Sequence, residues 1–244
     1  MWFDYSLIVL GAFLGAMVAG SAGFAFALVG AAVWLHVLPP IRVVTLVVIC
    51  SMLLHGALIW RLRHHIQKRL LWPFLAGALI GVPLGVAALQ RINAAKWQTA
   101  VGILLVAYSL YMLTRVHLPV LRLTTTTGKT LDGAVGLLGG FMGGATSLNG
   151  LFPTLWCGLR GWNKTVQRGI YQPFILLVHA YTLLWLGGIG SVSRQALIDV
   201  LICLPALIAG GLIGLRLFHF VSEDNFWRLV LWLFLLSGVT LIFQ

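Results

Sequence analysis

Two histidines occupy matching positions in two apolar runs of the chain. His55 lies in the run 43–60, and His179 lies 124 positions later in the run 169–187. Ionisable side chains inside runs of bilayer length are costly and tend to be functional. Imidazole changes its charge near neutral pH, so the pair predicts substrate binding or proton coupling. An interhelical hydrogen bond is the structural alternative.

Two glycine-rich interruptions carry the second chemical signal. Residues 19–23 interrupt the first long apolar run, and residues 143–150 interrupt the fifth. Glycine allows the non-helical dihedral angles of a break, and Ser, Thr or Asn can cap the helix that restarts. The amides and the positive dipole end of a restarting helix attract anions. Close packing of small residues is the alternative. The substrate-binding residues expected at these breaks are Ser21, Gly23, Thr146, Ser147, Asn149 and Gly150.

The helix after each break adds further candidates. Arg168 can clamp an oxyanion, and Gln172 lies one turn deeper on the same face. An interfacial cation that snorkels to the headgroups is the alternative for Arg168. Thr45 and Ser51 occupy the corresponding helix of the first half and are expected to line the same cavity.

The composition decides the protein class. The 244 residues are 60% hydrophobic and only 9% charged, with a mean hydropathy of +1.01, whereas soluble domains carry about 25% charged residues. The chain is therefore expected to be an all-α integral membrane protein with a single transmembrane domain, residues 1–244. The net charge of +11 comes from short loops between apolar runs. There it sets topology and contacts lipid, so nucleic-acid binding is not expected.

Enzymatic and metal chemistry find little support in the sequence. The chain contains no HExxH, GxSxG, P-loop or aspartate pair, and its three cysteines form no CxxC motif. We therefore expect no enzyme activity, no cofactor and no metal site. Asp132 lies at a run end and Asp199 near the start of a run. A cavity without buried carboxylates, fed by helix N-termini, suits an anion.

The apolar runs form two similar halves. Gly11, Gly15 and Met17 precede Gly136, Gly140 and Met142 by 125 positions. We expect repeat one at 5–114, a cytoplasmic linker at 115–132 and repeat two at 133–244. Matching interruptions in two halves are the best sequence pointer to the binding site of a transporter. The apolar runs are 5–36, 43–60, 70–90, 97–114, 133–158, 169–187, 195–215 and 227–243.

Basic residues distinguish two topologies. If every run crosses the membrane, the repeats are parallel and eight Lys and Arg lie on each side. If the two broken runs re-enter, each half crosses three times and the repeats are inverted, with 12 basic residues inside and 4 outside. Positive charge favours the cytoplasmic side. We therefore predict inverted repeats, each with a broken or re-entrant first segment plus three transmembrane helices, and both termini outside.

The glycine and proline spacings resemble those of the sulfite exporter TauE/SafE family of membrane permeases. The resemblance extends over nearly the whole chain. It implies transport of sulfur-containing anions such as sulfite, sulfoacetate or sulfonates across the bacterial inner membrane. Two departures stand out, because the first break lacks an extended glycine run and the second carries Thr-Ser-Leu-Asn. The matching features are Gly11-x-x-x-Gly15, Gly20-Ser-Ala-Gly23, Pro39-Pro40, Gly81-Val-Pro-Leu-Gly85, Gly136–Gly150 and Gly210-Gly211-Leu-Ile-Gly214.

The hypothesis from sequence is a multi-pass secondary transporter that holds a small anion between two repeats and works by alternating access. Protons are a candidate coupling ion, and membrane lipid is the surrounding partner. The pattern Gly11-x-x-x-Gly15 fits a homodimer contact or internal packing equally well. An anion channel and a non-transporting anchor or scaffold subunit are the alternatives.

Overall fold

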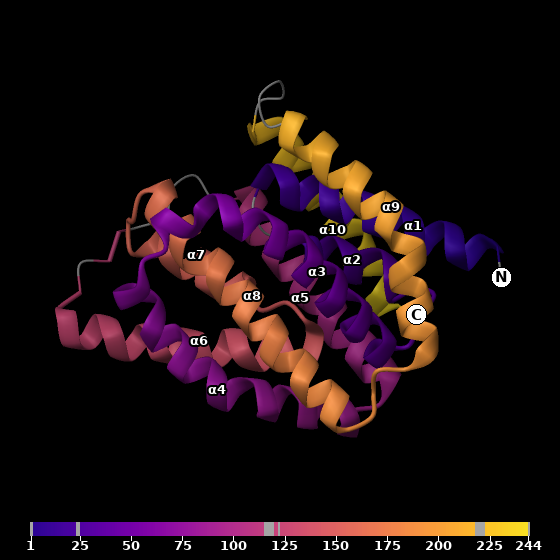
Figure 1. The fold of residues 1–244 in the computed structure, drawn as a ribbon, viewed down its shortest axis with the longest axis horizontal. Helices are drawn as coiled ribbons and strands as arrows, with labels where there is room; N and C mark the ends of the chain where they lie inside the picture. The colour runs from indigo at the N-terminus through magenta and orange to yellow at the C-terminus, as the bar shows by residue number, and fades with distance from the viewer. Residues whose placement is uncertain (1, 23–24, 115–119, 122, 218–222, 244) are drawn as a thin grey trace. The chain divides into compact units, whose positions relative to one another are not determined.

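The computed structural model describes residues 2–22, 25–114, 120–121, 123–217 and 223–243, and this part of the chain is helical with short connections (Figure 1). No strand occurs among these residues. The all-α prediction is therefore confirmed. The helices are α1 Trp2–Ala22, α2 Phe26–Trp34, α3 Pro40–Leu62, α4 Lys68–Arg91, α5 Ala94–Thr114, α6 Thr125–Thr146, α7 Leu151–Leu159, α8 Lys164–Gly188, α9 Arg194–Leu217 and α10 Glu223–Ile242, with a 3-10 turn at Arg63–His65.

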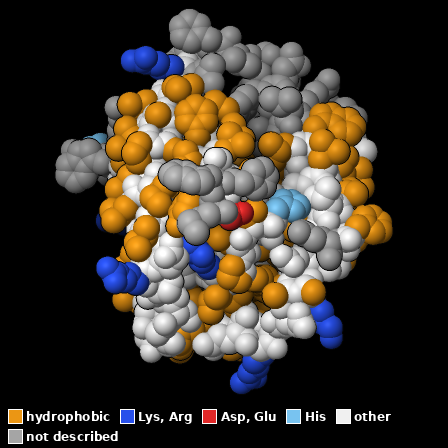
Figure 2. All heavy atoms as spheres, turned by 90° about the vertical axis from the view of Figure 1, so that its right-hand side faces the viewer, with side chains coloured by type: hydrophobic (Ala, Val, Ile, Leu, Met, Phe, Trp, Pro, Cys, Tyr) orange, Lys and Arg blue, Asp and Glu red, His pale blue; other side chains and the backbone are white. Residues whose placement is uncertain are grey.

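Within the described residues, five helices are long and apolar enough to cross a membrane, namely α3, α4, α5, α8 and α9. Two shorter helical stretches are also apolar, Asp4–Gly20 in α1 and Leu231–Ile242 in α10. The chain is therefore a multi-pass membrane protein. Many large apolar side chains face outward, among them Leu184 at 73% exposure and Trp72 at 67%. Figure 2 shows hydrophobic side chains over much of one face, with a few charged side chains among them.

The order of helix lengths is the same in both halves. A long first helix is followed by a break, a nine-residue helix (α2 or α7) and three long helices. This order is compatible with two repeats, and their inversion stays a prediction. The expected linker is shorter than its predicted range, because residues 125–132 already belong to α6. Thr124 caps that helix by accepting a hydrogen bond from the amide of Thr127.

The chain contacts define two compact units, and each unit takes helices from both halves. The first contains Met1–Cys50, Arg91–Val116 and Ser191–Gln244, and the second contains Ser51–Gln90 and His117–Gly190. In the first unit α9 packs along α1, and α5 packs along α10. A Cβ at Gly210 or Gly214 would overlap the backbone carbonyl of Phe13 or Met17. Close helix packing therefore requires glycine at both positions.

The second unit uses the same device. A Cβ added to Gly81 would overlap the carbonyl oxygen of Leu137, and one added to Gly144 would overlap that of Val82. Backbone of α4 thus lies directly against backbone of α6. The glycine spacings of these helices therefore serve internal packing. The close contact with α4 holds α6 in place, and with it the break that follows α6.

Candidate functional site

The second break lies between α6 and α7. α6 ends at Thr146, and Ser147 adopts a left-handed conformation with φ of 62°. The Ser147 amide donates to the carbonyl of Gly143 at 3.1 Å, which is a common way to end a helix. The sequence predicted a glycine at the non-helical position. Serine stands there instead, and left-handed backbone costs an L-residue about 1–2 kcal/mol.

The hydroxyl groups of Thr146 and Ser147 form hydrogen bonds with backbone groups of α6 and of the break itself. The Thr146 hydroxyl donates to the Met142 carbonyl at 2.8 Å and accepts from the Leu148 amide at 3.2 Å. The Ser147 hydroxyl donates to the Thr146 carbonyl. These side chains therefore finish α6, so the expectation that they cap the restarting helix is wrong.

The N-terminus of α7 has no side-chain cap. Gly150 occupies the N-cap position and makes no side-chain hydrogen bond. Pro153, in the first turn, has no amide hydrogen. Gly150 packs against the Ile175 side chain, 2.8 Å from where a Cβ would lie, so the backbone approaches α8 closely. The Leu151 amide lies 3.4 Å from the Leu148 carbonyl, so the Phe152 amide and the positive dipole end of α7 are what this N-terminus offers to an anion.

Two hydrogen bonds join the break to α8. The side-chain amide of Asn149 donates to the Ile175 carbonyl at 3.0 Å. Nε2 of His179 lies 3.1 Å from the Ser147 carbonyl, and because a carbonyl only accepts, that nitrogen carries the proton. Asn149 and His179 are both fully buried. The structure therefore brings together the break and the histidine that the sequence singled out.

Nδ1 of His179 and Oγ1 of Thr182 are buried polar atoms of α8 that have no hydrogen-bond partner among the described residues. Both residues have 0% exposure. Helical threonines commonly donate to the carbonyl four residues earlier, as Thr146 and Thr154 do here. Sequence reasoning missed Thr182, and the available signal was its position three residues after His179, which places both on one helix face.

The other expected residues of the second unit lie at different depths. His55 donates from Nδ1 to the Ser51 carbonyl at 2.9 Å, and both side chains are buried. Gln172 is buried on α8, two turns before His179. Arg168 lies eleven residues before His179, about 16 Å along the helix axis. The helix therefore separates Arg168 from the break, and Arg168 is only half-buried.

The first break and Thr45 belong to the first unit. α1 stays helical through Ala22, so residues 19–22 of the predicted stretch 19–23 belong to the helix. Ala25 is left-handed with φ of 74° and begins α2 without a side-chain cap. The side chain of Ser21 and the whole of Gly23 lie outside the described residues. Thr45 is buried and donates to the Ile41 carbonyl at 2.8 Å.

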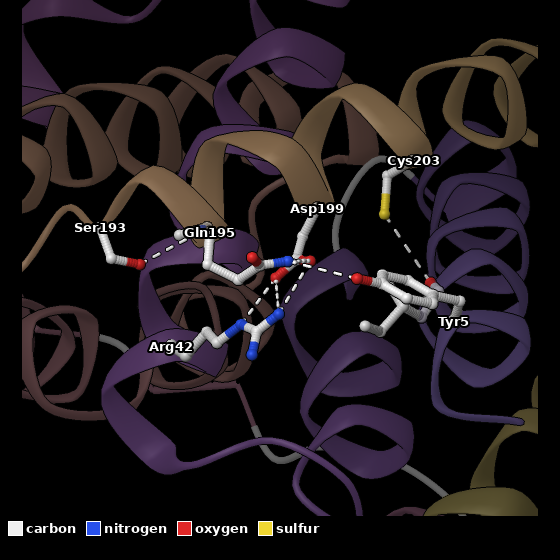
Figure 3. A network of polar contacts seen from close by, with 8 residues as sticks. Tyr5, Arg42, Ser193, Gln195, Asp199 and Cys203 are labelled. Carbon is white, nitrogen blue, oxygen red and sulfur yellow. Dashed lines mark hydrogen bonds and ion pairs between the residues drawn. The ribbon is translucent and has the colours of Figure 1, made fainter. Parts of the chain in front are cut away.

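Two buried carboxylates correct the sequence analysis, which expected none. Asp132 accepts from Nε1 of Trp156 at 2.6 Å and from Arg160 at 2.9 Å. In the first unit Arg42 donates to both oxygens of Asp199, at 2.7 and 2.9 Å (Figure 3). A carboxylate tolerates burial when a cation and hydrogen bonds compensate it. Arginines of the short loops between the apolar runs, which were expected to set topology, supply that compensation here.

The charge inventory defines what the second break can hold. The buried polar side chains among the described residues include no lysine and no arginine. Asp132 lies fifteen residues before Ser147, about 22 Å along α6, and is neutralised by Arg160. The break thus offers backbone amides, a helix dipole and neutral side chains, which suits a small anion.

Comparisons with known proteins give one match. A family model described as sulfite exporter TauE/SafE matches residues 7–241, almost the whole chain. No curated protein and no solved structure matches.

Proposed function

The chain belongs to the sulfite exporter TauE/SafE family, a family of membrane transporters of sulfite-type anions, and from that membership we propose that the α6–α7 break is its anion-binding site. The observation that carries the proposal is the uncapped N-terminus of α7 beside a fully buried histidine. A small sulfur-containing anion such as sulfite, sulfoacetate or another sulfonate accepts hydrogen bonds from the amides of α7. The helix dipole compensates part of its charge.

The residues of the break have distinct roles in this proposal. The Phe152 amide contacts the anion, because the Leu151 amide faces the Leu148 carbonyl and Pro153 has no amide hydrogen. His179 and Thr182 contribute side-chain atoms from α8, since both present buried unpartnered atoms there. Asn149 holds the break against α8 through Ile175, so it positions the α7 N-terminus. Gln172 and His55 lie in the same unit and extend the polar path.

Transport by alternating access in a bacterial inner membrane, with two inverted repeats, completes the proposal. The buried Asn149 and His179 contacts join α8 to the α6–α7 segment. A movement of α8 relative to that segment therefore opens or closes the break. Such movements of helix bundles around a fixed site are typical of secondary transporters.

Uptake of radiolabelled sulfite into proteoliposomes tests the proposal. The full chain is expected to show saturable uptake that an opposing gradient of unlabelled sulfite accelerates by counterflow. A channel passes sulfite without counterflow, and a scaffold subunit passes none, so either result overturns secondary transport.

A double variant locates the site. Asn149→Ala with His179→Ala is expected to abolish saturable uptake. A matched double variant, Asn93→Ala with His36→Ala, removes the same residue types from the first unit and is expected to retain it. Unchanged flux in the first variant would exclude the break as the site.

A further inference from the structure

We propose that the anion is bound together with one proton, held between Nδ1 of His179 and an oxygen of the anion. This inference rests on the proposed function and names the ionic species that the site accepts. It follows from the hydrogen-bond chemistry of one fully buried ring and of its neighbours.

The Ser147 carbonyl fixes the proton on one side of the ring. Nε2 of His179 lies 3.1 Å from that oxygen, and a carbonyl has no hydrogen to donate. Nε2 therefore carries the hydrogen, and in the neutral ring Nδ1 holds a lone pair. Nδ1 has no partner among the described residues. An anion oxygen bound next to Nδ1 would face the lone pair of that nitrogen, and the two would repel each other. One hydrogen between the two atoms turns this repulsion into a hydrogen bond.

Among the side chains that the structure describes, no fixed cation near the break replaces that hydrogen. The neighbouring α6–α7 segment 146–151 carries no titratable side chain. Asp132 and Arg160, from α6 and the end of α7, neutralise each other at the far end of α6. From α3, His55 is the titratable electrostatic neighbour of the His179 ring, and its Nδ1 hydrogen is engaged by the Ser51 carbonyl. On α8, Arg168 lies about 16 Å away along the helix.

Thr182 supplies the complementary donor. Its hydroxyl is unpartnered among the described residues and lies one turn from His179 on the same face. A hydroxyl donates one hydrogen, as do the amides of α7, so the other groups of the break satisfy anion oxygens. Nδ1 of His179, in contrast, is a hydrogen-bond acceptor and needs a donor on the ligand. The site therefore favours an oxyanion that bears a hydrogen, such as hydrogensulfite, over the sulfite dianion.

An anion without a hydrogen must acquire the proton from solution. When a sulfonate binds, Nδ1 takes a proton from water and the ring becomes an imidazolium that donates from both nitrogens. The proton leaves with the anion on release. The same complex therefore forms in two ways, with the proton delivered on the ligand or taken up by the ring.

Calorimetry of the purified full chain, with methanesulfonate and with sulfite as probes, tests this directly. Titrations in buffers of different ionisation enthalpy count the protons taken up per anion. Methanesulfonate, which stays deprotonated near neutral pH, is expected to bind with uptake of one proton, and its affinity is expected to fall about tenfold per pH unit above neutrality. Sulfite is expected to bind without uptake where hydrogensulfite predominates, and with uptake where the dianion predominates.

A variant assigns the proton to the ring. His179→Gln keeps an amide that can donate to the Ser147 carbonyl but cannot take up a proton, so proton uptake with methanesulfonate is expected to disappear. His36→Gln, a histidine variant in the first unit, is expected to retain it. The number of protons taken up per anion is measured first on the unmodified protein. That number therefore tests the proposal even if the variant does not fold.

The outcomes separate the two proposals. Binding of both anions without proton uptake at any pH overturns this inference and leaves the proposed function standing. Proton uptake that persists in a folded His179→Gln variant also overturns it. Absence of binding by either anion at every pH overturns the proposed function itself.

Discussion

At the scale of one residue, Thr182 carries a buried hydroxyl that makes no hydrogen bond to any described residue. A buried hydroxyl without a hydrogen bond carries an uncompensated desolvation cost. Thr182→Val is therefore expected to leave stability unchanged or to raise it by up to about 1 kcal/mol. Sulfite binding is expected to weaken by roughly tenfold, the equivalent of one hydrogen bond. Thermal unfolding in detergent, with and without sulfite, measures both effects.

Thr146→Val is the matched control for that variant. Its hydroxyl serves both the Met142 carbonyl and the Leu148 amide, so its loss is expected to cost about 1–3 kcal/mol of stability. If Thr182→Val destabilises the protein equally, the Thr182 hydroxyl has a structural partner and has no role in anion binding.

Residue types predicted some of the site, and geometry supplied the rest. Burial of His55 and His179 followed from their depth in apolar runs. The roles of Thr146 and Ser147 did not follow, because a hydroxyl near a helix end can bond forward to the restarting helix or backward to the finished one. The pairing of Asp132 with Arg160 joins positions 28 residues apart, which no local pattern reveals.

At the scale of the helix, glycine decides how closely α4 and α6 approach. A Cβ at Gly81 would overlap the Leu137 carbonyl and lie 2.7 Å from the Phe141 nitrogen. Backbone atoms cannot rotate away as a side chain can, so the helices must separate. Gly81→Ala is expected to cost about 1–3 kcal/mol and to weaken sulfite binding, because α6 carries the break. Thermal midpoints across a sulfite concentration series measure both.

Gly187→Ala gives the contrast within the same unit. Nothing lies within 4 Å of a Cβ at that position of α8. Alanine is a better helix former than glycine by about 1 kcal/mol, so this variant is expected to be neutral or stabilising and to bind sulfite normally. A similar loss in both variants would show that helix propensity, rather than the α4–α6 contact, sets the effect.

Helix breaks were predicted within a few residues, and their conformation was not. The composition of 143–150 located the second break, whereas the first came after Ala22 rather than before it. Glycines of the predicted stretches can remain helical when they allow close packing, and Gly20 packs against the backbone of Gly211. The residues next to the breaks that adopt left-handed backbone are Ala25 and Ser147, not glycines. Tertiary contacts, which sequence periodicity does not contain, made that choice.

For the whole molecule, the two units cut across the two halves of the sequence. The second unit combines α4 from the first half with α6, α7 and α8 from the second. Hydropathy and glycine spacing predicted helices and a repeat. They did not predict that each unit combines helices from both halves. A run of small residues predicts a packing face, but it does not predict which helix packs there.

Contacts within the second unit distinguish the two topologies. The amide of Gln67 donates to the Gly169 carbonyl, and that of Leu121 donates to the Leu159 carbonyl. These bonds place Gln67, Leu121 and the connection 160–168 at one end of the unit. Parallel repeats put 61–69 and 160–168 on opposite sides of the membrane, whereas inverted repeats put them on the same side. The contacts are therefore compatible with inverted repeats.

Cysteine labelling in intact cells is the corresponding experiment. Replacing the buried Cys50, Cys157 and Cys203 with alanine gives a background without thiols. Single cysteines are then introduced as Gln67→Cys, Lys164→Cys and Arg194→Cys. A membrane-impermeant maleimide is expected to label Arg194→Cys from outside and to reach Gln67→Cys and Lys164→Cys only after permeabilisation, because basic loops stay in the cytoplasm. Labelling of Lys164→Cys from outside, with Gln67→Cys protected, would establish parallel repeats and overturn the inverted arrangement.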